Sequence, residues 1–220
     1  WIYAHPADGF KEETGWYPEA LKNHTWDAIT LQPFDRLIEG EDGDLSMAVK
    51  FIELSRARSP KARLLIYSRW PRKAQDGGID FPLFWGKKYT AGWDGTNETR
   101  DYFLKLLGSL KNALPADANR LFIVPVGDVL LALDGKLRAK PTGGLSGAKD
   151  LYTDGIHFGD KGAFVVGTTF FAVLFKRSPL GLSAESYGVK DQPFVKLVQQ
   201  TVWDVVLNDP LTGVKSLSSG

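Results

Sequence analysis

Short apolar runs bounded by polar or turn-forming residues recur along the chain. They occupy residues 27–33, 62–68 and 120–126, and the first of them ends in Pro33. Continuous apolar runs of about four to eight residues are typical of strands buried on both faces of a sheet. We therefore expect these segments to form a buried sheet, with loops leaving from the carboxyl ends of the strands.

Between and beyond these runs, apolar residues repeat at the spacing of an amphipathic helix. We expect helices over residues 45–58, 96–113, 126–133, 159–175 and 192–207. Asp44 and Thr96 are placed to cap the first two of them. Alternating strands and helices are typical of parallel strands joined by right-handed crossovers. The pattern predicts an α/β fold in which residues 1–220 form a single domain, a three-layer α/β/α sandwich around a central parallel sheet.

The connection that follows the second predicted strand, residues 69–95, is long for a loop and rich in aromatic side chains. Connections of this length in a compact domain usually serve a function, and we predict that this one forms the wall of a pocket. Trp85 and Trp93 are candidates to stack on a sugar ring, or else to anchor the segment to the domain. Arg69 and Trp70, at the strand's end, are candidates to line the substrate pocket or to pack beneath the segment.

The amino-acid composition argues against several classes of partner and site. Lys and Arg total 27 against 26 Asp and Glu, and no basic run concentrates the excess of +1, which argues against nucleic acid. The absence of cysteine excludes disulfides, thiolate metal sites and a cysteine nucleophile. His5 and His24 have no partner at metal-ligand spacing, so we predict no metal site. The longest apolar stretch, residues 162–175, is shorter than the roughly 20 residues that cross a bilayer, so we expect no membrane span.

Asp154 and His157 lie three residues apart in a glycine-containing turn before a predicted helix. This spacing lets the carboxylate reach one imidazole nitrogen while the other faces a cleft. A histidine oriented in this way is the general base that a serine hydrolase requires. The motif is short, and by itself it is weak evidence, because an aspartate that caps the next helix beside a surface histidine also explains it.

A longer comparison favours the catalytic interpretation. The block Leu-Tyr-Thr-Asp-Gly-Ile-His-Phe-Gly-Asp-Lys-Gly at 151–162 resembles the last conserved block of SGNH/GDSL hydrolases. Trp-Asp-Ala-Ile-Thr-Leu-Gln-Pro at 26–33 is similar to the strand and oxyanion block of one subgroup of that superfamily. Residues 62–70 and 123–128 resemble the two strands that come between these blocks. The similarity covers residues 16–182 in the expected order.

The resemblance implies a flavodoxin-like fold and a serine esterase that needs no cofactor. It assigns His157 as general base, Asp154 as its partner, and Gln32 as an oxyanion donor where most of the family has asparagine. Gln32 could alternatively be a loop amide that bonds nearby backbone. The resemblance further favours a carbohydrate O-acetyl ester as substrate, and it makes a secreted or periplasmic location plausible for a protein whose leader has been removed.

The family's nucleophile is not recognisable. Its first block, a strand ending in Gly-Asp-Ser or Gly-Asn-Ser, precedes the strand at residue 26, and residues 1–26 do not contain it. Ser46, in Gly-Asp-Leu-Ser, follows the wrong strand and opens a helix. Because the chain begins with Trp1 rather than methionine, we expect the serine upstream of residue 1. The alternatives are a non-catalytic carbohydrate-binding or scaffold domain, and a hydrolase whose nucleophile comes from a separate polypeptide.

Overall fold

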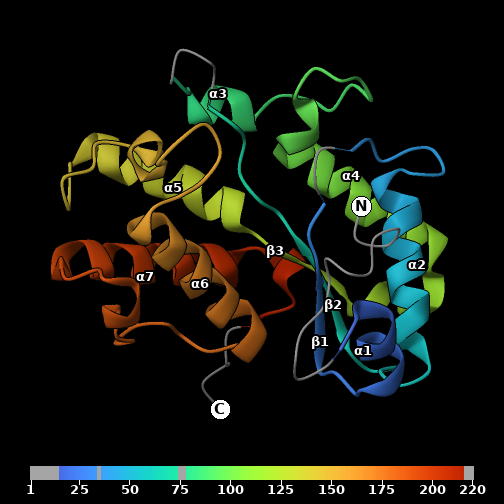
Figure 1. The fold of residues 1–220 in the computed structure, drawn as a ribbon. Coiled ribbons are helices and arrows are strands. Elements are labelled where there is room, and N and C mark those ends of the chain that lie inside the picture. Colours follow the sequence, from blue (N-terminus) through green and yellow to red (C-terminus); the bar gives the residue numbers. More distant parts are fainter. Residues whose placement is uncertain (1–14, 34–35, 74–77, 216–220) are drawn as a thin grey trace.

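The computed structural model describes residues 15–33, 36–73 and 78–215 of the chain. The three predicted strands form one parallel sheet in the order β1-β2-β3, as Figure 1 shows. Their bounds are Ala28–Leu31 for β1, Arg63–Tyr67 for β2 and Leu121–Val124 for β3. The central strand β2 is the most deeply buried, because Leu64, Leu65 and Ile66 are 0% exposed. The prediction of a buried parallel sheet is confirmed.

The α-helices of the described residues are α1 (Tyr17–Asn23), α2 (Asp44–Arg56), α3 (Phe81–Trp85), α4 (Arg100–Ala113), α5 (Val126–Ala139), α6 (Asp160–Phe175) and α7 (Gln192–Asn208). The predictions for α2, α4, α6 and α7 are correct to within a few residues. The prediction for α5 is too short, because the helix continues to Ala139. The two short helices α1 and α3 were not predicted.

Both predicted helix caps are wrong. Asp44 is the first residue of α2 rather than its cap, and its buried carboxylate accepts a hydrogen bond from the Tyr102 hydroxyl. The side chain that caps α4 is that of Thr99, because residues 96–98 form a separate 3₁₀ turn. At Asp44, a contact with a residue remote in sequence accounts for the difference. At Thr96, the additional 3₁₀ turn moves the start of the helix away from the residue that the local pattern predicts.

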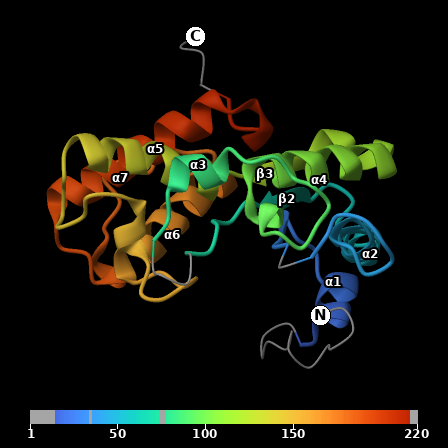
Figure 2. The same ribbon diagram turned by 90° about the horizontal axis from the view of Figure 1, so that it is seen from above.

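The helices cover opposite faces of the sheet. Figures 1 and 2 show α2 and α4 on one side of the strands and α5, α6 and α7 on the other. Side chains alternate between the faces of a strand. Arg63 and Tyr67 of β2 therefore share one face, where Arg63 donates to the carbonyl of Val173 at 2.7 Å and the Tyr67 ring lies 4.8 Å from that of Phe170. This is the face on which α6 packs.

The two edges of the sheet differ. Beside β3, the 3₁₀ turn Pro210–Thr212 packs against the strand, and Gly213 fits directly against the ring of Phe122. At the other edge, β1 pairs only with β2 among the described residues, and Thr30 is exposed where its partner Leu65 is fully buried. One edge of the sheet is thus covered and the other is open within the described part of the chain.

Across the described ranges, none of the helices combines the length and the apolar character needed to cross a membrane.

Candidate active site

Asp154 and His157 form a hydrogen-bonded pair. Nδ1 of His157 lies 2.8 Å from Oδ2 of Asp154, while Oδ1 of the same carboxylate accepts the backbone N–H groups of Ile156 and His157, each at 2.7 Å. The N–H of His157, then that of Ile156, then the imidazole hold the pKa of Asp154 well below its usual range. An ionised carboxylate only accepts hydrogen bonds, so in the neutral imidazole Nδ1 carries the proton and Nε2 carries the lone pair of a general base.

The imidazole faces solvent. The side chain of His157 is 76% exposed and that of Asp154 is 54% exposed. The turn between them is closed by an antiparallel bridge, in which the N–H of Thr153 donates to the carbonyl of His157 at 2.8 Å. Nε2 is therefore accessible to a reacting group, which the sequence interpretation of this pair requires.

The segment that leaves β2 holds this turn. The indole N–H of Trp70 donates to the carbonyl of Ile156 at 2.7 Å, and its ring stacks on Phe158 with centroids 3.9 Å apart. The backbone N–H of Lys73 donates to the carbonyl of Gly155 at 2.8 Å. The Tyr152 hydroxyl completes the set with a 2.7 Å bond to the carbonyl of Pro71. These contacts place the Asp154–His157 turn at the carboxyl edge of the sheet, where open α/β sheets bind ligands.

A buried ion pair also holds the segment that leaves β2. Glu98 accepts from Nη2 of Arg69 at 2.8 Å, from Nε of Arg72 at 3.1 Å, and from the backbone N–H of Arg72 at 2.9 Å. Glu98 and Arg69 are each 3% exposed. Charges buried this deeply are tolerated when they are paired and hydrogen-bonded, and losing one partner is costly. Arg69 therefore packs beneath the aromatic segment, which is the alternative to lining the substrate pocket that the sequence left open.

The tryptophan candidates have different environments. Trp85 is 1% exposed, packs on Phe81 and Phe103, and donates to Oδ1 of Asp128 at 3.0 Å, so its ring is not available to stack on a sugar. Trp93 is 76% exposed and keeps that candidacy. Trp70 is half-buried, with one ring face on Phe158, and it supports the turn. The four-residue spacing of Phe81 and Trp85 is the signal for a helix that buries both.

Gln32 is exposed immediately after β1. Because β1 and β2 are adjacent and parallel, Gln32 lies at the same edge of the sheet as the segment that begins with Ser68. No hydrogen bond within the described ranges joins Gln32 to Asp154 or His157. Gln32 thus lies at the same edge of the sheet as the segment that holds the Asp154–His157 turn.

The serines of the described part of the chain do not complete a triad, since none hydrogen-bonds to His157. Ser46 lies in the first turn of α2, as predicted. Ser68 was not considered at the sequence level, although it directly follows β2. It is 1% exposed, and its Oγ has no hydrogen-bond partner among the described residues. Alternation along the strand directs it away from the face of Tyr67, whose ring contacts Trp70.

Comparisons with known proteins support a fold for this chain and indicate no activity. No protein-family model matches the chain, and neither does any curated protein. Among solved structures, the 1.50 Å crystal structure of a DUF4886 family protein from Bacteroides uniformis is similar, with a TM-score of 0.54 and 17% identity. The match covers 91% of this chain and 71% of that one. At this identity the likeness supports a shared α/β fold alone.

The described residues include no group of three or more His, Cys, Asp or Glu side chains that could hold a metal ion. His24 is exposed near Trp26, and His5 lies outside the described residues.

Proposed function

We propose that this chain carries the acid–base half of an SGNH/GDSL-type serine ester hydrolase. The observation that supports the proposal is the Asp154–His157 pair, with its 2.8 Å contact, its ionised carboxylate and its exposed imidazole. A capping aspartate beside a surface histidine needs only the backbone bonds to Oδ1. It does not require a hydrogen bond between the second carboxylate oxygen and Nδ1. Nor does it require hydrogen bonds between the turn and the segment that follows β2.

In the proposed reaction, Nε2 of His157 removes the proton from a serine hydroxyl as its oxygen attacks the ester carbonyl. Asp154 stabilises the imidazolium that results. The imidazolium then returns its proton to the departing alcohol, which leaves an acyl-serine, and water releases the acid by the same steps. Gln32 is the proposed donor to the oxyanion, a type of contact worth about 3 kcal/mol in comparable sites.

We place the serine on a strand that pairs with the open edge of β1. Support comes from that edge and from the exposure of Thr30, since an interior strand of a parallel sheet is covered on both faces. A fourth strand there would give the three-layer, flavodoxin-like sandwich. Its serine would lie outside residues 1–220, on a preceding segment or on a separate polypeptide.

The proposed substrate is an O-acetyl ester of a carbohydrate. The exposed ring of Trp93 is compatible with a sugar ligand, because indole faces stack on the apolar faces of sugars. A secreted or periplasmic location is part of the same proposal.

Fluorophosphonate labelling of the protein from its natural source tests this function. Intact mass is measured before and after labelling, and the labelled peptide is sequenced. We expect one adduct on a serine outside residues 1–220, and we expect it to be lost in His157→Ala and retained in His24→Ala, which changes another exposed histidine. A second short polypeptide carrying the adduct would show that the nucleophile is supplied separately.

Two results would contradict the proposal. An adduct on Ser46 or Ser68 would show that the catalytic assignment is wrong. No adduct on any serine would leave a non-catalytic domain on a hydrolase-like fold.

A further inference from the structure

Exposed apolar side chains gather at the carboxyl end of α6. In the described part of the chain, the large apolar side chains that are exposed are those of Trp16, Leu83, Trp93, Phe175, Leu180 and Leu182. Phe175 ends α6, and the two leucines lie in the turn that follows it. Their exposed fractions are 63%, 46% and 37%. Single exposed apolar residues are ordinary on a protein surface, whereas three within residues 175–182 favour an interaction site.

The turn that presents the two leucines has a fixed shape. The buried side chain of Gln199 in α7 accepts the N–H of Gly181 at 3.2 Å and donates to the carbonyl of Leu182 at 2.8 Å. The N–H of Leu182 donates to the carbonyl of Pro179 at 3.1 Å, and Pro179 is itself buried. The backbone is thus anchored to the domain while the leucine side chains stay exposed, so binding would cost little conformational entropy.

The same segment is basic. Lys176 and Arg177 directly follow Phe175, and both are exposed. Neither forms an ion pair with a residue in the described ranges, and residues 161–184 contain no Asp or Glu. Exposed apolar side chains beside uncompensated cations are typical of segments that bind the surface of an anionic bilayer.

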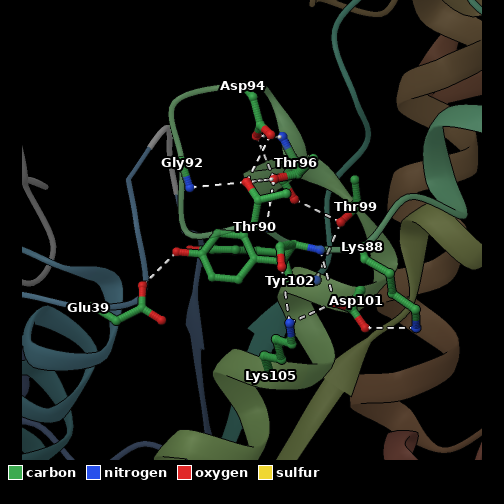
Figure 3. Close-up of polar contacts among 11 residues, drawn as sticks. Glu39, Lys88, Thr90, Gly92, Asp94, Thr96, Thr99, Asp101, Tyr102 and Lys105 are labelled. Carbon is green, nitrogen blue, oxygen red and sulfur yellow. Dashed lines mark hydrogen bonds and ion pairs between the residues drawn. The ribbon is translucent and has the colours of Figure 1, made fainter.

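Trp93, the most exposed of the six, lies beside a negative charge instead. Figure 3 shows the loop of residues 90–96, in which Oδ2 of Asp94 accepts the Thr90 hydroxyl at 2.8 Å. Oδ1 accepts the Thr96 hydroxyl at 2.6 Å and the Thr96 N–H at 3.1 Å. The Thr96 hydroxyl, followed by the Thr96 N–H and the Thr90 hydroxyl, lowers the pKa of Asp94 to about 2. The ionised carboxylate would be repelled by an anionic bilayer, so this loop does not share the character of residues 175–182.

Residues 175–182 lie far from the candidate active site. α6 begins three residues after His157, and its 16 residues extend over about 24 Å. Near its other end, the carbonyl of Val173 accepts a hydrogen bond from Arg63, the first residue of β2. The apolar segment is therefore at the amino edge of the sheet, whereas His157 is at the carboxyl edge.

We propose that residues 175–182 dock this protein on the surface of a lipid bilayer that carries anionic headgroups. The three apolar side chains enter the boundary between headgroups and acyl chains, and Lys176 and Arg177 pair with the phosphate groups. A bilayer fits this segment better than a protein partner does, because the segment is short and its charge has one sign, whereas a protein interface involves about 20–30 residues on each side. Docking is independent of the hydrolase function proposed above, and it leaves His157 on the side away from the bilayer.

Co-sedimentation with vesicles tests this docking. The full chain is mixed with vesicles of phosphatidylcholine, with or without about one-third phosphatidylglycerol, and the bound fraction is measured. We expect binding to the anionic vesicles. The double variant Leu180→Ser/Leu182→Ser should bind at least about tenfold more weakly, because apolar contact with the bilayer is lost. Lys176→Gln/Arg177→Gln should weaken binding by a similar factor, because attraction to the headgroups is lost.

Matched control variants change exposed residues of the same types elsewhere on the molecule. Leu83→Ser is the control for the leucine variant, and Lys87→Gln/Lys88→Gln is the control for the charge variant. Both controls should bind like the unchanged protein. Because all of these side chains are exposed, every variant should also keep the melting temperature of the unchanged protein to within a few degrees.

A fluorophore reports whether the turn itself enters the bilayer. Because the chain has no cysteine, Leu180→Cys and Leu83→Cys can each carry a single environment-sensitive dye. On anionic vesicles we expect the emission at position 180 to move to shorter wavelength and the emission at position 83 to stay unchanged. Vesicle binding without a shift at position 180, no binding to either kind of vesicle, or equal binding by the leucine variant and the unchanged protein would each overturn the proposal. A shift at position 180 that grows with protein concentration in the absence of lipid would also overturn it, because the turn would then contact a second copy of the chain.

Discussion

The aromatic segment, together with the Asp154–His157 turn that it holds, has two parts that are held in place by different forces. At its base, α3 packs Trp85 against α4 and α5, and the indole lies so close to Gly127 that a Cβ there would be 2.0 Å from it. At the rim, the Asp154–His157 turn and the 90–96 loop keep their shape through side-chain hydrogen bonds. Close packing determines the stability of the base, whereas polar geometry determines what the rim can bind or catalyse. Substitutions in one part should therefore leave the property of the other unchanged.

The largest effect should come from the rim. In the natural protein, His157→Ala should lower ester hydrolysis by about 1,000-fold or more, because the general base is lost. Its melting temperature should stay within a few degrees of the unchanged protein, since a side chain that is 76% exposed adds little packing. Rates on 4-nitrophenyl acetate and thermal unfolding measure the two quantities. A large drop in melting temperature would show that the turn is structural.

The next largest effect should come from the base. Gly127→Ala should lower the free energy of unfolding by about 1–3 kcal/mol, because the added methyl group overlaps the buried indole of Trp85. Gly135, in the same helix, has no atoms within 4 Å of an added Cβ, so Gly135→Ala should raise the free energy of unfolding by about 0.5–1 kcal/mol. Urea unfolding compares the two variants. Equal stabilities would contradict a base held by close packing.

A smaller effect should come from Trp70, which connects the segment after β2 to the Asp154–His157 turn. Trp70→Phe keeps a ring to stack on Phe158 and removes the N–H that binds the carbonyl of Ile156, at a cost of about 1 kcal/mol. We expect the His157 imidazole to become more mobile and its Nδ1-protonated tautomer less populated, as measured by ¹⁵N NMR. Trp203→Phe, a half-buried tryptophan in α7, is the control. An unchanged His157 spectrum in Trp70→Phe would show that Trp70 does not position the turn.

The smallest effect should be the pH response of the 90–96 loop. The folded-state pKa of Asp94 is lowered from 3.8 to about 2, so its hydrogen bonds stabilise the loop above pH 4 and are lost as the pH falls through 2. The amide signals of Gly92 and Thr96 should shift together in this range. Asp94→Asn should abolish that transition. A common midpoint near pH 4 would show that the loop does not hold the carboxylate ionised.

The sequence predicted elements whose signals are local. The apolar runs of β1, β2 and β3 and the helical periodicity of α4, α6 and α7 follow from neighbouring residues, and so does the three-residue spacing of Asp154 and His157. The burial of Arg69 depends on Glu98, 29 residues away. The burial of Trp85 depends on the space left by Gly127 in another helix. Such contacts are decided by tertiary packing, which residue patterns in one segment do not encode.

Among the described residues no strand pairs with the outer edge of β1, and this has a consequence for handling the 220-residue chain. Natural sheets guard their outer strands with lysine, proline, bulges or covering segments, because unpaired backbone groups recruit other chains and lead to aggregation. The strand reads Ala-Ile-Thr-Leu, with neither charge nor proline among its four residues. Its composition is typical of an interior strand of a sheet. At high concentration the chain should therefore self-associate through β1, and a peptide that pairs with this strand should improve its solubility.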